Sequence, residues 1–336
     1  MREFAHGGDI KSFAKMVGCK ESEVIDLSSN INFVKPNVSF DFRLSKLSPY
    51  PNYDELYQEV AKFYKTEPEN LELFNGATVA IDRVLESLRG EFNTISIYSP
   101  AYLEYKRVAQ KYNYKIKLID RFSSAKLPPK NSLVIFVNPS TPDGEFSDIE
   151  PLLKLCEFRG SALVVDESFL EFYDSNKSAT SLLEEFENLF VIKSMSKYFG
   201  LAGVRVGAVV ANRDFINSLK EKEPLWKISS FDKEYILSSL KDKSFEQISK
   251  EQNRVAKEFL FETLSNSPLV EKVYPSQANF FLAKSKIKAK KLQEILAPKR
   301  VLIRECSNFD FLDEFYFRVA VKDIDSLRVF KEAICE

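Results

Sequence analysis

The chain has 336 residues, which is long for one compact core and short for three domains, so we expect one large domain and one smaller one. Hydrophobic residues make up 44 % of the chain and charged residues 29 %, which is the composition of a folded globular protein. The formal net charge of −1 gives no bulk attraction to nucleic acid, and no apolar run is long enough to span a membrane.

The cysteines and the single histidine restrict the chemistry further. Cys19, Cys156, Cys306 and Cys335 are scattered without metal-ligand spacing, which is typical of reduced thiols in a cytoplasmic protein. His6 is the only histidine, so a two-histidine zinc site is excluded and no metal is expected. The N-terminus has no apolar core followed by small residues, so we expect no signal peptide and a cytoplasmic protein.

In chain order, the first 45 or so residues lack a regular alternation and are expected to pack against the smaller domain. From about residue 53 to residue 210, helical patterns alternate with short β-rich runs, which predicts a sheet covered on both faces. The expected helices are 53–65, 77–88, 101–112 and 149–158. The expected strands are 95–98, 116–119, 133–137, 163–165, 189–192 and 206–210.

After Trp226 the pattern changes to an α+β segment. We expect a long charged helix over 231–264, short strands at 273–274 and 279–283, a helix over 288–296, strands near 301–304 and 314–321, and a last helix from 324. The sequence therefore predicts an α/β large domain over 46–230 and a smaller domain formed by 1–45 and 231–336.

The most informative segment is S-M-S-K-Y-F-G-L-A-G-V-R, which follows an apolar strand and contains Lys197. A lysine that reacts as an amine needs a fixed position and a lowered pKa, which burial beside other positive groups provides. Ser194 and Ser196 could donate hydroxyl hydrogen bonds to a phosphate, and Arg205 could add a charge-assisted one. Taken alone, a lysine after a strand is more often a solvated surface residue.

Two further segments would complete such a site. Asp166 ends the apolar run L-V-V-D, where a buried carboxylate needs a partner; the alternative is a strand-end residue that caps the next turn. F-N-G-A-T precedes a helical pattern, and backbone N–H groups at a helix start favour phosphate. This places Ala77 and Thr78 as candidate phosphate ligands, although a plain capped helix would look the same.

Together these segments resemble the class I/II aminotransferases, a fold type I family that depends on pyridoxal 5'-phosphate (PLP), in the branch containing histidinol-phosphate aminotransferase and threonine-phosphate decarboxylase. The resemblance implies an α/β fold: a large domain with a mainly parallel sheet and a smaller α+β domain. It implies PLP as the cofactor, held as a Schiff base by Lys197. Asp166 would face the protonated pyridine nitrogen.

The resemblance also assigns further cofactor contacts. N-P-S-T-P-D-G resembles the family's N-P-N-N-P-T-G turn, whose second Asn binds the cofactor's phenolic oxygen; Thr141 stands there, and Asn138 remains. Phe169 replaces a tyrosine that usually contacts the same oxygen. Tyr102 matches an aromatic ring stacked on the cofactor, with core packing as the alternative. Tyr50 matches a tyrosine that reaches the partner subunit's cofactor phosphate, which implies a homodimer.

Both ends of the chain look like threonine-phosphate decarboxylase, where the matching regions contact substrate. They are the start around His6 and Gly8, the segment D-L-S-S-N-I-N with Asn30, the segment V-L-I-R-E-C-S-N-F that ends at Phe309, and F-R-V-A-V around Arg318. Arg318 matches a carboxylate-binding arginine, and Arg304 and His6 match groups near the substrate phosphate. Arginine suits both tasks because its planar fork binds carboxylate and phosphate in a bidentate way. The alternatives are surface salt bridges for the arginines and a solvated histidine.

The resemblance thus implies a PLP-dependent decarboxylase of a small phosphorylated amino acid, O-phospho-L-threonine or O-phospho-L-serine, that releases CO₂ and a phospho-amine. The alternative is a histidinol-phosphate-type aminotransferase, because the same residues could hold the Cα–H bond perpendicular to the cofactor plane in place of the bond to the carboxylate. A binding protein without catalysis is disfavoured because Lys197, Asp166 and Arg205 are all retained. We expect neither nucleic acid nor membrane as a partner.

Overall fold

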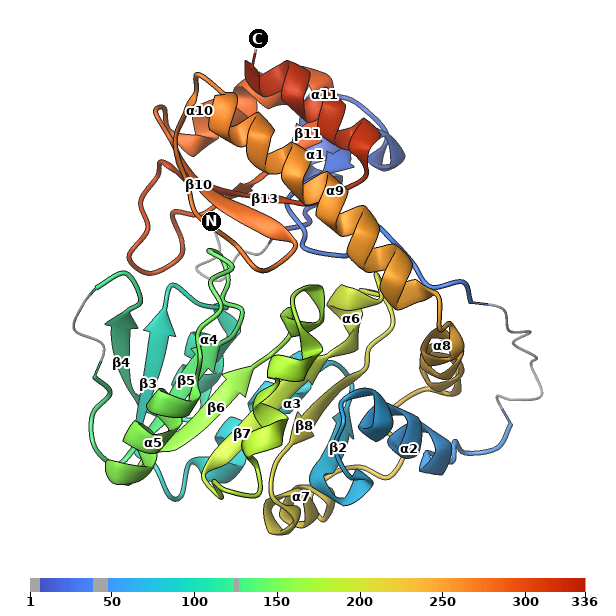
Figure 1. Cartoon of the computed structure of the whole chain (residues 1–336), viewed down its shortest axis with the longest axis vertical. Helices are drawn as coiled ribbons and strands as arrows, with labels where there is room; N and C mark the ends of the chain where they lie inside the picture. Colours follow the sequence, from blue (N-terminus) through green and yellow to red (C-terminus); the bar gives the residue numbers. More distant parts are fainter. Residues whose placement is uncertain (1–6, 39–47, 124–126, 336) are drawn as a thin grey trace.

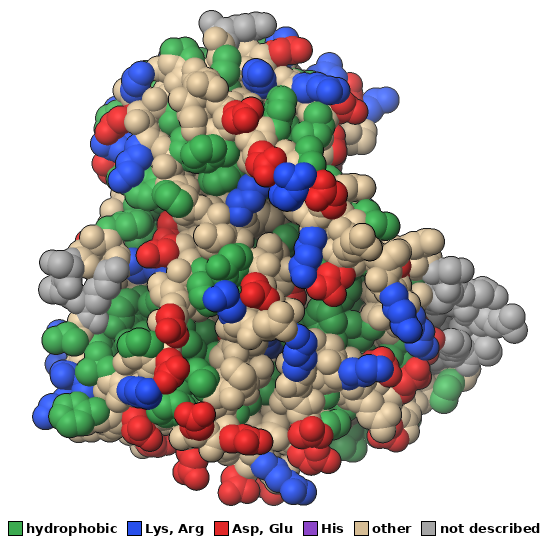
Figure 2. All heavy atoms as spheres, viewed as in Figure 1, with side chains coloured by type: hydrophobic (Ala, Val, Ile, Leu, Met, Phe, Trp, Pro, Cys, Tyr) green, Lys and Arg blue, Asp and Glu red, His purple; other side chains and the backbone are tan. Residues whose placement is uncertain are grey.

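The computed structural model describes residues 7–38, 48–123 and 127–335. These residues form two parts, a larger one built on a wide sheet and a smaller one stacked above it (Figure 1). Figure 2 shows basic and acidic side chains interspersed over the visible face, in keeping with the near-zero net charge. In the described ranges, none of the helices combines the length and apolarity that a membrane span would need.

Within the described residues, the large sheet has seven strands. In spatial order these are β2 (Leu71–Phe74), β8 (Gly207–Val210), β7 (Leu189–Ser194), β6 (Ala162–Asp166), β5 (Ser132–Val137), β3 (Thr94–Ser99) and β4 (Lys115–Asp120). The strands from β7 to β4 are parallel, and β8 runs antiparallel to both of its neighbours. Every residue of β5, β6 and β7 is buried, as expected for a sheet covered on both faces.

Helices cover both faces of this sheet. The core on one face includes side chains of α3 (Ala77–Leu88), α4 (Glu104–Lys111) and α7 (Arg213–Lys220). The core on the other face includes side chains of α2 (Asp54–Phe63), α5 (Glu150–Phe158) and α8 (Ser230–Lys241). The turns η3 (Pro68–Asn70), η4 (Leu170–Phe172), η5 (Ser175–Lys177) and η6 (Ala179–Leu182) and the short helix α6 (Met195–Tyr198) complete this part.

The smaller part contains a four-stranded antiparallel sheet in the order β12 (Arg304–Glu305), β13 (Tyr316–Ala320), β10 (Phe280–Ser285) and β9 (Val270–Val273). It packs against α9 (Phe245–Asn266), α10 (Ala289–Leu296) and α11 (Ile324–Cys335). The N-terminal segment adds α1 (Ile10–Val17), η1 (Glu21–Glu23) and β1 (Ile25–Asp26). Because β1 pairs in parallel with β11 (Val301–Leu302), which follows η7 (Ala297–Lys299), the two ends of the chain lie together.

The structure corrects two predicted elements. The helix expected over 231–264 is two helices, α8 and α9, because Asp242 Oδ1 accepts hydrogen bonds from the Ser244 N–H (3.0 Å) and hydroxyl (2.6 Å), a local turn that competes with the helix. The strand expected near 301–304 is divided between β11 and β12, which pair with different sheets.

The predicted division of the chain at residue 230 stays a proposal. Helix α8 begins at that boundary, and its side chains Ile236 and Leu237 belong to the core of the large sheet. The chain therefore leaves the larger part nearer to the turn between α8 and α9 than to residue 230.

Candidate active site

A cavity of about 200 Å³ lies between the two parts, at the carboxyl ends of the central strands of the large sheet. Ligand sites of α/β proteins are typically found at this edge. The larger part contributes Asp166, Lys197 and Arg205 to its wall, and the smaller part and the N-terminal segment contribute Asn30, Arg304 and Arg318. Residues far apart in the sequence thus meet around one space.

Lys197 lies on α6, the short helix that directly follows β7. Because the helix starts where the strand ends, at the edge of the sheet, the lysine has a fixed position in the cavity wall. Burial lowers the pKa of Lys197 to about 8; the positive charges of Arg318 and Arg205 act in the same direction, and Asp166 opposes them. A larger share of this amine is therefore neutral, and nucleophilic, than for an ordinary lysine.

Asp166 ends β6 and is 3 % exposed. Its Oδ1 accepts hydrogen bonds from the N–H (2.9 Å) and hydroxyl (2.6 Å) of Ser168, and its Oδ2 accepts one from the Tyr105 hydroxyl (2.9 Å). Burial raises the pKa of Asp166, while these donors and Lys197 oppose that rise. The carboxylate is thus held in one orientation, with capacity left for a positively charged partner in the cavity.

An anion-binding cradle lies at the start of α3. Ala77 and Thr78 occupy its first turn, where backbone N–H groups have no acceptor within the helix. Arg205 Nη1 donates to the Ser196 hydroxyl (3.2 Å), and both residues line the cavity. A Cβ on Gly76, whose φ is +82°, would lie 2.4 Å from Arg205 Nη2. The glycine therefore leaves room for the guanidinium beside the helix start.

The same cradle depends on a second glycine. A Cβ on Gly207 of β8 would lie 2.4 Å from the Ala77 nitrogen, so only glycine allows α3 to start this close to the sheet. Ser194, the residue before α6, and Tyr102 complete this end of the cavity. The Tyr102 hydroxyl is hydrogen-bonded to Thr78. Hydroxyls, helix N–H groups and a guanidinium together form a binding set for a phosphate.

Arg318 is the most unusual charge in the cavity. It lies on β13 and is 8 % exposed; Nη1 donates to Thr141 Oγ1 and Nη2 to the Ser28 carbonyl, both at 2.9 Å. Its Nε has no hydrogen-bond partner among the described residues, and no carboxylate there pairs with it. Burial lowers its pKa to about 10. A buried guanidinium without a carboxylate partner is costly, and an anionic ligand would offset that cost.

The other predicted substrate residues lie around Arg318. Arg304 of β12 lines the cavity and donates to the Glu305 carbonyl (2.6 Å) and to Asn308 Oδ1 (2.8 Å). Asn30 also lines it, and its buried Oδ1 has no hydrogen-bond partner in the part of the chain that the structure describes. His6 lies outside the described residues. Its neighbour Gly7 reaches the cavity wall.

Three predicted residues lie away from this cavity's wall. The Asn138 side chain exchanges two hydrogen bonds with the backbone of Ser147, both at 2.9 Å, so it holds its own turn together. Gly8 donates its N–H to the Ser28 hydroxyl (2.7 Å) and is exposed. Tyr50 is 73 % exposed and stacks on Trp226, with ring centroids 3.8 Å apart.

Sequence reasoning missed Tyr105, Ser168 and the Ser28 carbonyl, which orient Asp166 and Arg318. Tyr105 follows Tyr102 by three residues, and such spacing places two side chains on one side of a helical turn, a signal that was available. The Ser28 carbonyl had no such signal, since any residue type supplies one. Phe309, which also lines the cavity, lies within a segment that the sequence did single out.

A further missed residue, Asn32, joins three elements. Its N–H donates to the Lys197 carbonyl (3.1 Å), and its Nδ2 donates to the Tyr198 carbonyl (2.7 Å) and to Ser249 Oγ on α9 (2.8 Å). Asn253 of α9 donates to its Oδ1 at 2.9 Å. One amide side chain therefore connects the N-terminal segment, the end of α6 and the smaller part.

A reactive lysine, an opposed carboxylate and a phosphate cradle, at the edge of a sheet of this topology, define a PLP-dependent enzyme of fold type I. The chain belongs to the class I and II aminotransferase family, whose family model, described as "Aminotransferase class I and II", matches residues 34–334. PLP is accordingly its cofactor, and the residues present fit it: Gly76 leaves room for the Arg205 guanidinium beside the start of α3, and Gly207 lets that helix start close to β8.

Similar proteins include both aminotransferases and decarboxylases. Histidinol-phosphate aminotransferase of Methanocaldococcus jannaschii is 26 % identical over 355 aligned positions, which cover 100 % of this chain and 95 % of that protein. The structure of histidinol-phosphate aminotransferase from Clostridium acetobutylicum has a TM-score of 0.82 at 26 % identity, covering 92 % of this chain and 97 % of that one.

Two decarboxylase structures are also similar to this chain, and they differ in the fraction of each chain that is covered. A decarboxylase from Sulfurospirillum multivorans has a TM-score of 0.72 at 26 % identity, covering 83 % of this chain and 84 % of that one. L-threonine-O-3-phosphate decarboxylase from Porphyromonas gingivalis has a TM-score of 0.75 at 22 % identity, covering 98 % and 96 %, and supports the fold alone. The comparisons therefore give the family and the cofactor and leave the reaction to be decided from the site.

Proposed function

We propose that the protein decarboxylates a small phosphorylated amino acid, O-phospho-L-threonine or O-phospho-L-serine, to CO₂ and a phospho-amine. The observation that carries this proposal is Arg318, a buried guanidinium with an unsatisfied Nε in the wall of the cavity that Lys197 also lines. The two fixed bonds to Thr141 and Ser28 use two of its five N–H donors and leave three for other partners. A substrate carboxylate is the group that matches it.

The chain's own residues divide the work. Ser196, Arg205 and the start of α3 hold the cofactor phosphate, and Asp166 holds the positive charge of the pyridine ring. When bound, PLP acts as an electron sink for negative charge that develops at the substrate's Cα. Lys197 would hold the cofactor through Nζ, and its free, protonated amine would deliver a proton to the substrate's Cα.

Orientation of the substrate is the task of Arg318. By fixing the carboxylate, it would set which bond at the substrate's Cα is oriented for cleavage. Because Thr141 and Ser28 pin two of its nitrogens, the guanidinium cannot rotate freely to follow a different substrate pose. A carboxylate held in the orientation that aligns the Cα–C bond for cleavage would favour loss of CO₂.

A second anion fits the same cavity. Arg304 lies in its wall together with Arg318, and the charge of Arg304 is among the influences that lower the pKa of Arg318. Two neighbouring guanidinium groups exceed the need of one carboxylate, so a substrate with both carboxylate and phosphate balances the site. The segments that resemble threonine-phosphate decarboxylase meet here, since Gly7, Asn30 and Phe309 all line this cavity.

The second candidate is an aminotransferase of the histidinol-phosphate type. It is favoured by the match of such an enzyme to all of this chain and by a similar structure of the same activity. Histidinol phosphate carries a phosphate but no carboxylate, whereas its amino acceptor carries carboxylates. The two arginines could therefore serve the two half-reactions in turn.

The first experiment places the cofactor. Borohydride reduction of the holoenzyme followed by peptide mapping is expected to give an adduct on Lys197, because this amine lies in the cavity with a lowered pKa. Lys197→Ala is expected to fold and to lose turnover. An adduct on any other lysine would contradict the proposed site.

The second experiment separates the reactions. The holoenzyme is incubated with O-phospho-L-threonine, with O-phospho-L-serine, and with histidinol phosphate plus 2-oxoglutarate. We expect CO₂ and a phospho-amine from one of the first two and no keto acid. The two substrates differ by one methyl group, which a pocket discriminates by about 1–3 kcal/mol, so a preference rather than exclusion is expected. Glutamate formed without CO₂ would replace the decarboxylase by the aminotransferase.

The third experiment tests the second anion. Arg304→Ala is expected to weaken kcat/KM for the phosphorylated substrate by about 2 kcal/mol, or roughly 30-fold, because the charged phosphate loses a buried partner. The unphosphorylated analogue is the control and is expected to change far less. Equal losses for both compounds would show that Arg304 stabilises the structure and does not recognise phosphate.

A further inference from the structure

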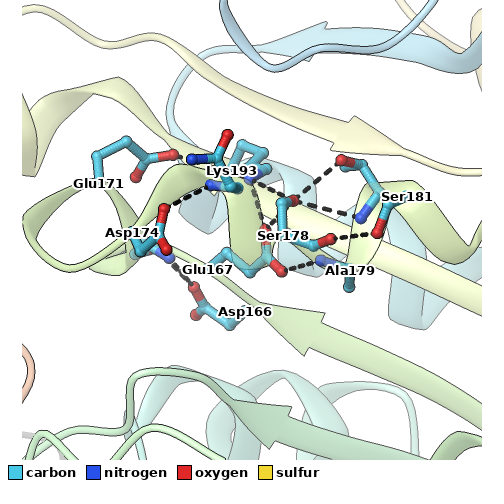
Figure 3. A network of polar contacts seen from close by, with 11 residues as sticks. Asp166, Glu167, Glu171, Asp174, Ser178, Ala179, Ser181 and Lys193 are labelled. Carbon is cyan, nitrogen blue, oxygen red and sulfur yellow. Dashed lines mark hydrogen bonds and ion pairs between the residues drawn. The ribbon is translucent and has the colours of Figure 1, made fainter. Parts of the chain in front are cut away.

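A second pair of buried charges lies directly behind the site residues. Glu167 follows Asp166 in the chain, and Lys193 precedes Ser194; each is 1 % exposed. The Lys193 Nζ lies 2.5 Å from Glu167 Oε2 (Figure 3). Because successive residues at the end of a strand point to opposite faces, Asp166 and Ser194 face the cavity while this pair faces away from it.

All polar atoms of the pair are used. Glu167 Oε1 accepts from the Ala179 N–H and Oε2 from the Ser178 hydroxyl, both at 2.6 Å, and Lys193 also donates to Ser178 Oγ at 3.1 Å (Figure 3). Ser178 and Ala179 begin η6, at the far end of the segment that leaves β6. That segment contains Phe169, which lines the cavity. The pair therefore fixes the ends of two strands and the loop between them.

Its location on the sheet is specific. Strands β6 and β7 are parallel neighbours, with Asp166 opposite Ile192, and the Glu167 N–H donates to the Ile192 carbonyl at 3.0 Å. The ion pair thus crosses from one strand to the other immediately beyond their last paired residues. Asp166 is the last residue of β6, and Lys197 lies one helical turn after β7.

Stability alone does not account for such a pair. Removing two charges from water costs about as much as their attraction returns, so buried ion pairs are often no more stabilising than apolar side chains of similar size. An ion pair whose polar atoms all have partners favours one arrangement of the two strands. Any slip of one strand against the other would leave a buried charge without its partner.

We propose that Glu167 and Lys193 are positioning residues, which lock the carboxyl ends of β6 and β7 and thereby hold the Asp166 carboxylate and the Lys197 amine in the arrangement that the cofactor requires. This inference rests on the roles proposed above for Asp166 and Lys197. The pair touches neither cofactor nor substrate in this scheme. It acts through the two strands.

The neighbouring Glu171 offers a matched control. It is equally enclosed, at 5 % exposed, and its Oε1 lies 3.7 Å from the Lys193 Nζ. It lies on η4, and its Oε2 has no hydrogen-bond partner in the described ranges, so it links no strand to another. Glu171→Gln removes a carboxylate from the same cluster and leaves the cross-strand contact in place.

The experiment compares four proteins: Glu167→Gln with Lys193→Met as a double variant, Glu167→Asp, Glu171→Gln and the wild type. The double variant removes both charges, so no buried charge is left without a partner. For each protein we measure the Kd for PLP of the apoenzyme, the visible circular dichroism of the bound cofactor, kcat and KM, and the melting temperature of the apoenzyme.

We expect the double variant to melt near the wild-type temperature. Its visible circular dichroism should change, its Kd for PLP should rise, and kcat should fall about tenfold to a hundredfold with KM little changed, as for a misplacement of reacting groups by up to 1 Å. Glu167→Asp keeps both charges but shortens the arm by one methylene, and is expected to change the dichroism in the same direction. Glu171→Gln should match the wild type in all four measurements.

Wild-type dichroism, cofactor affinity and kcat in the double variant would overturn the proposal, whatever its melting temperature. If the double variant does not fold, the same result for Glu167→Asp overturns it. Effects in Glu171→Gln as large as those in the double variant would also overturn it, because burial and not the cross-strand link would then be the cause. Failure of the proposed function is seen separately, as an adduct away from Lys197 in the wild type.

Discussion

Lys197 lies among charges of both signs, and each changes its reactivity in a predictable direction. Arg318 and Arg205 stabilise the neutral amine, and Asp166 stabilises the protonated one, on top of the effect of burial. A pKa of about 8 leaves the amine poised near neutral pH. The arginines that we propose bind anionic ligands therefore also favour the neutral form of the lysine before any ligand is bound.

Arg318 and Asp166 are expected to shift the pKa of Lys197 in opposite directions when each is replaced by a neutral residue. In the apoenzyme, Arg318→Gln removes a positive charge and is expected to raise the pKa of Lys197 above about 8, toward its ordinary value of 10.5. Asp166→Asn removes a negative charge and is expected to lower it. The measurement is the pH dependence of acylation of Lys197, followed by mass spectrometry. Shifts in the same direction in both variants would show that the changes act through packing and not through charge.

Predicted site residues whose chemistry requires one side-chain type lie in the cavity wall, whereas Asn138, which matches only a family position, does not. Lys197, Asp166, Arg205 and Arg318 all line the cavity, as their sequence contexts indicated. Asn138 keeps a family asparagine, but its amide bonds Ser147 in its own turn. A sequence cannot show which of two possible partners a side chain selects, because that depends on backbone directions set elsewhere in the fold.

Thr141 shows the converse. The resemblance places it where an asparagine contacts the cofactor, and in the structure its hydroxyl accepts a hydrogen bond from Arg318 at 2.9 Å. A threonine has one hydroxyl and a short side chain, so its task is to orient the guanidinium. The departure from the family motif was readable in the sequence, whereas its partner, 177 positions away, was not.

Among the elements, the start of α3 is the one that we propose binds the cofactor phosphate, so its placement can be tested directly. Gly207→Ala would place a methyl group 2.4 Å from the Ala77 nitrogen, so the helix start must move away from β8. Overpacking of this kind costs about 1–3 kcal/mol, and we expect the Kd for PLP to rise about tenfold to a hundredfold. Equilibrium titration of the apoenzyme with PLP measures it.

Gly203→Ala is the matched control for this prediction. Gly203 lies four residues earlier in the same segment, and its added Cβ would meet no heavy atom within 4 Å. The control is therefore expected to bind PLP like the wild type. If both variants bind with wild-type affinity, the cradle tolerates displacement of the helix start, and the close approach of α3 to β8 has no role in holding the phosphate.

Strong apolar periodicity predicted the existence of helices well. It did not predict where a polar side chain bonds the backbone and ends a helix. The helix expected over 77–88 has those bounds in the structure, since its apolar residues recur on one face. The α8–α9 break depends on one aspartate side chain that bonds two residues ahead, and helical periodicity does not register it. Strand β2 was not predicted, because Glu72 interrupts the apolar residues of Leu71–Phe74, although the structure buries all four.

For the whole molecule, the exposed Tyr50 and Trp226 indicate a surface that is incomplete in a single chain. The stacked pair, with Leu225 at 75 % exposed beside it, forms an apolar patch on the larger part. Aromatic side chains at such exposure are typical of protein interfaces. We propose a homodimer in which Tyr50 reaches the partner subunit's cofactor, as the family resemblance implies.

Mixing two inactive variants tests this homodimer. Tyr50→Phe subunits and Lys197→Ala subunits are each impaired, but a mixed dimer contains one site free of both changes if Tyr50 crosses between subunits. We expect the mixture to regain up to about half the wild-type activity per mixed dimer, together with a dimer mass in analytical ultracentrifugation. Activity no higher than the sum of the separate variants would contradict a shared site, and a monomeric mass would contradict the dimer itself.

The pairing of β1 with β11 and the contacts of Asn32 set a condition for hybrid enzymes assembled from related chains. In the C-terminal third, β11 pairs with residues 25 and 26, and α9 is linked to the backbone of Lys197 through Asn32. A hybrid that took its last hundred residues from another parent would split these contacts between two origins. Residues 25–34 should therefore come from the same parent as the C-terminal part. Such a hybrid needs one exchange of parent after residue 34 and a second before the C-terminal part.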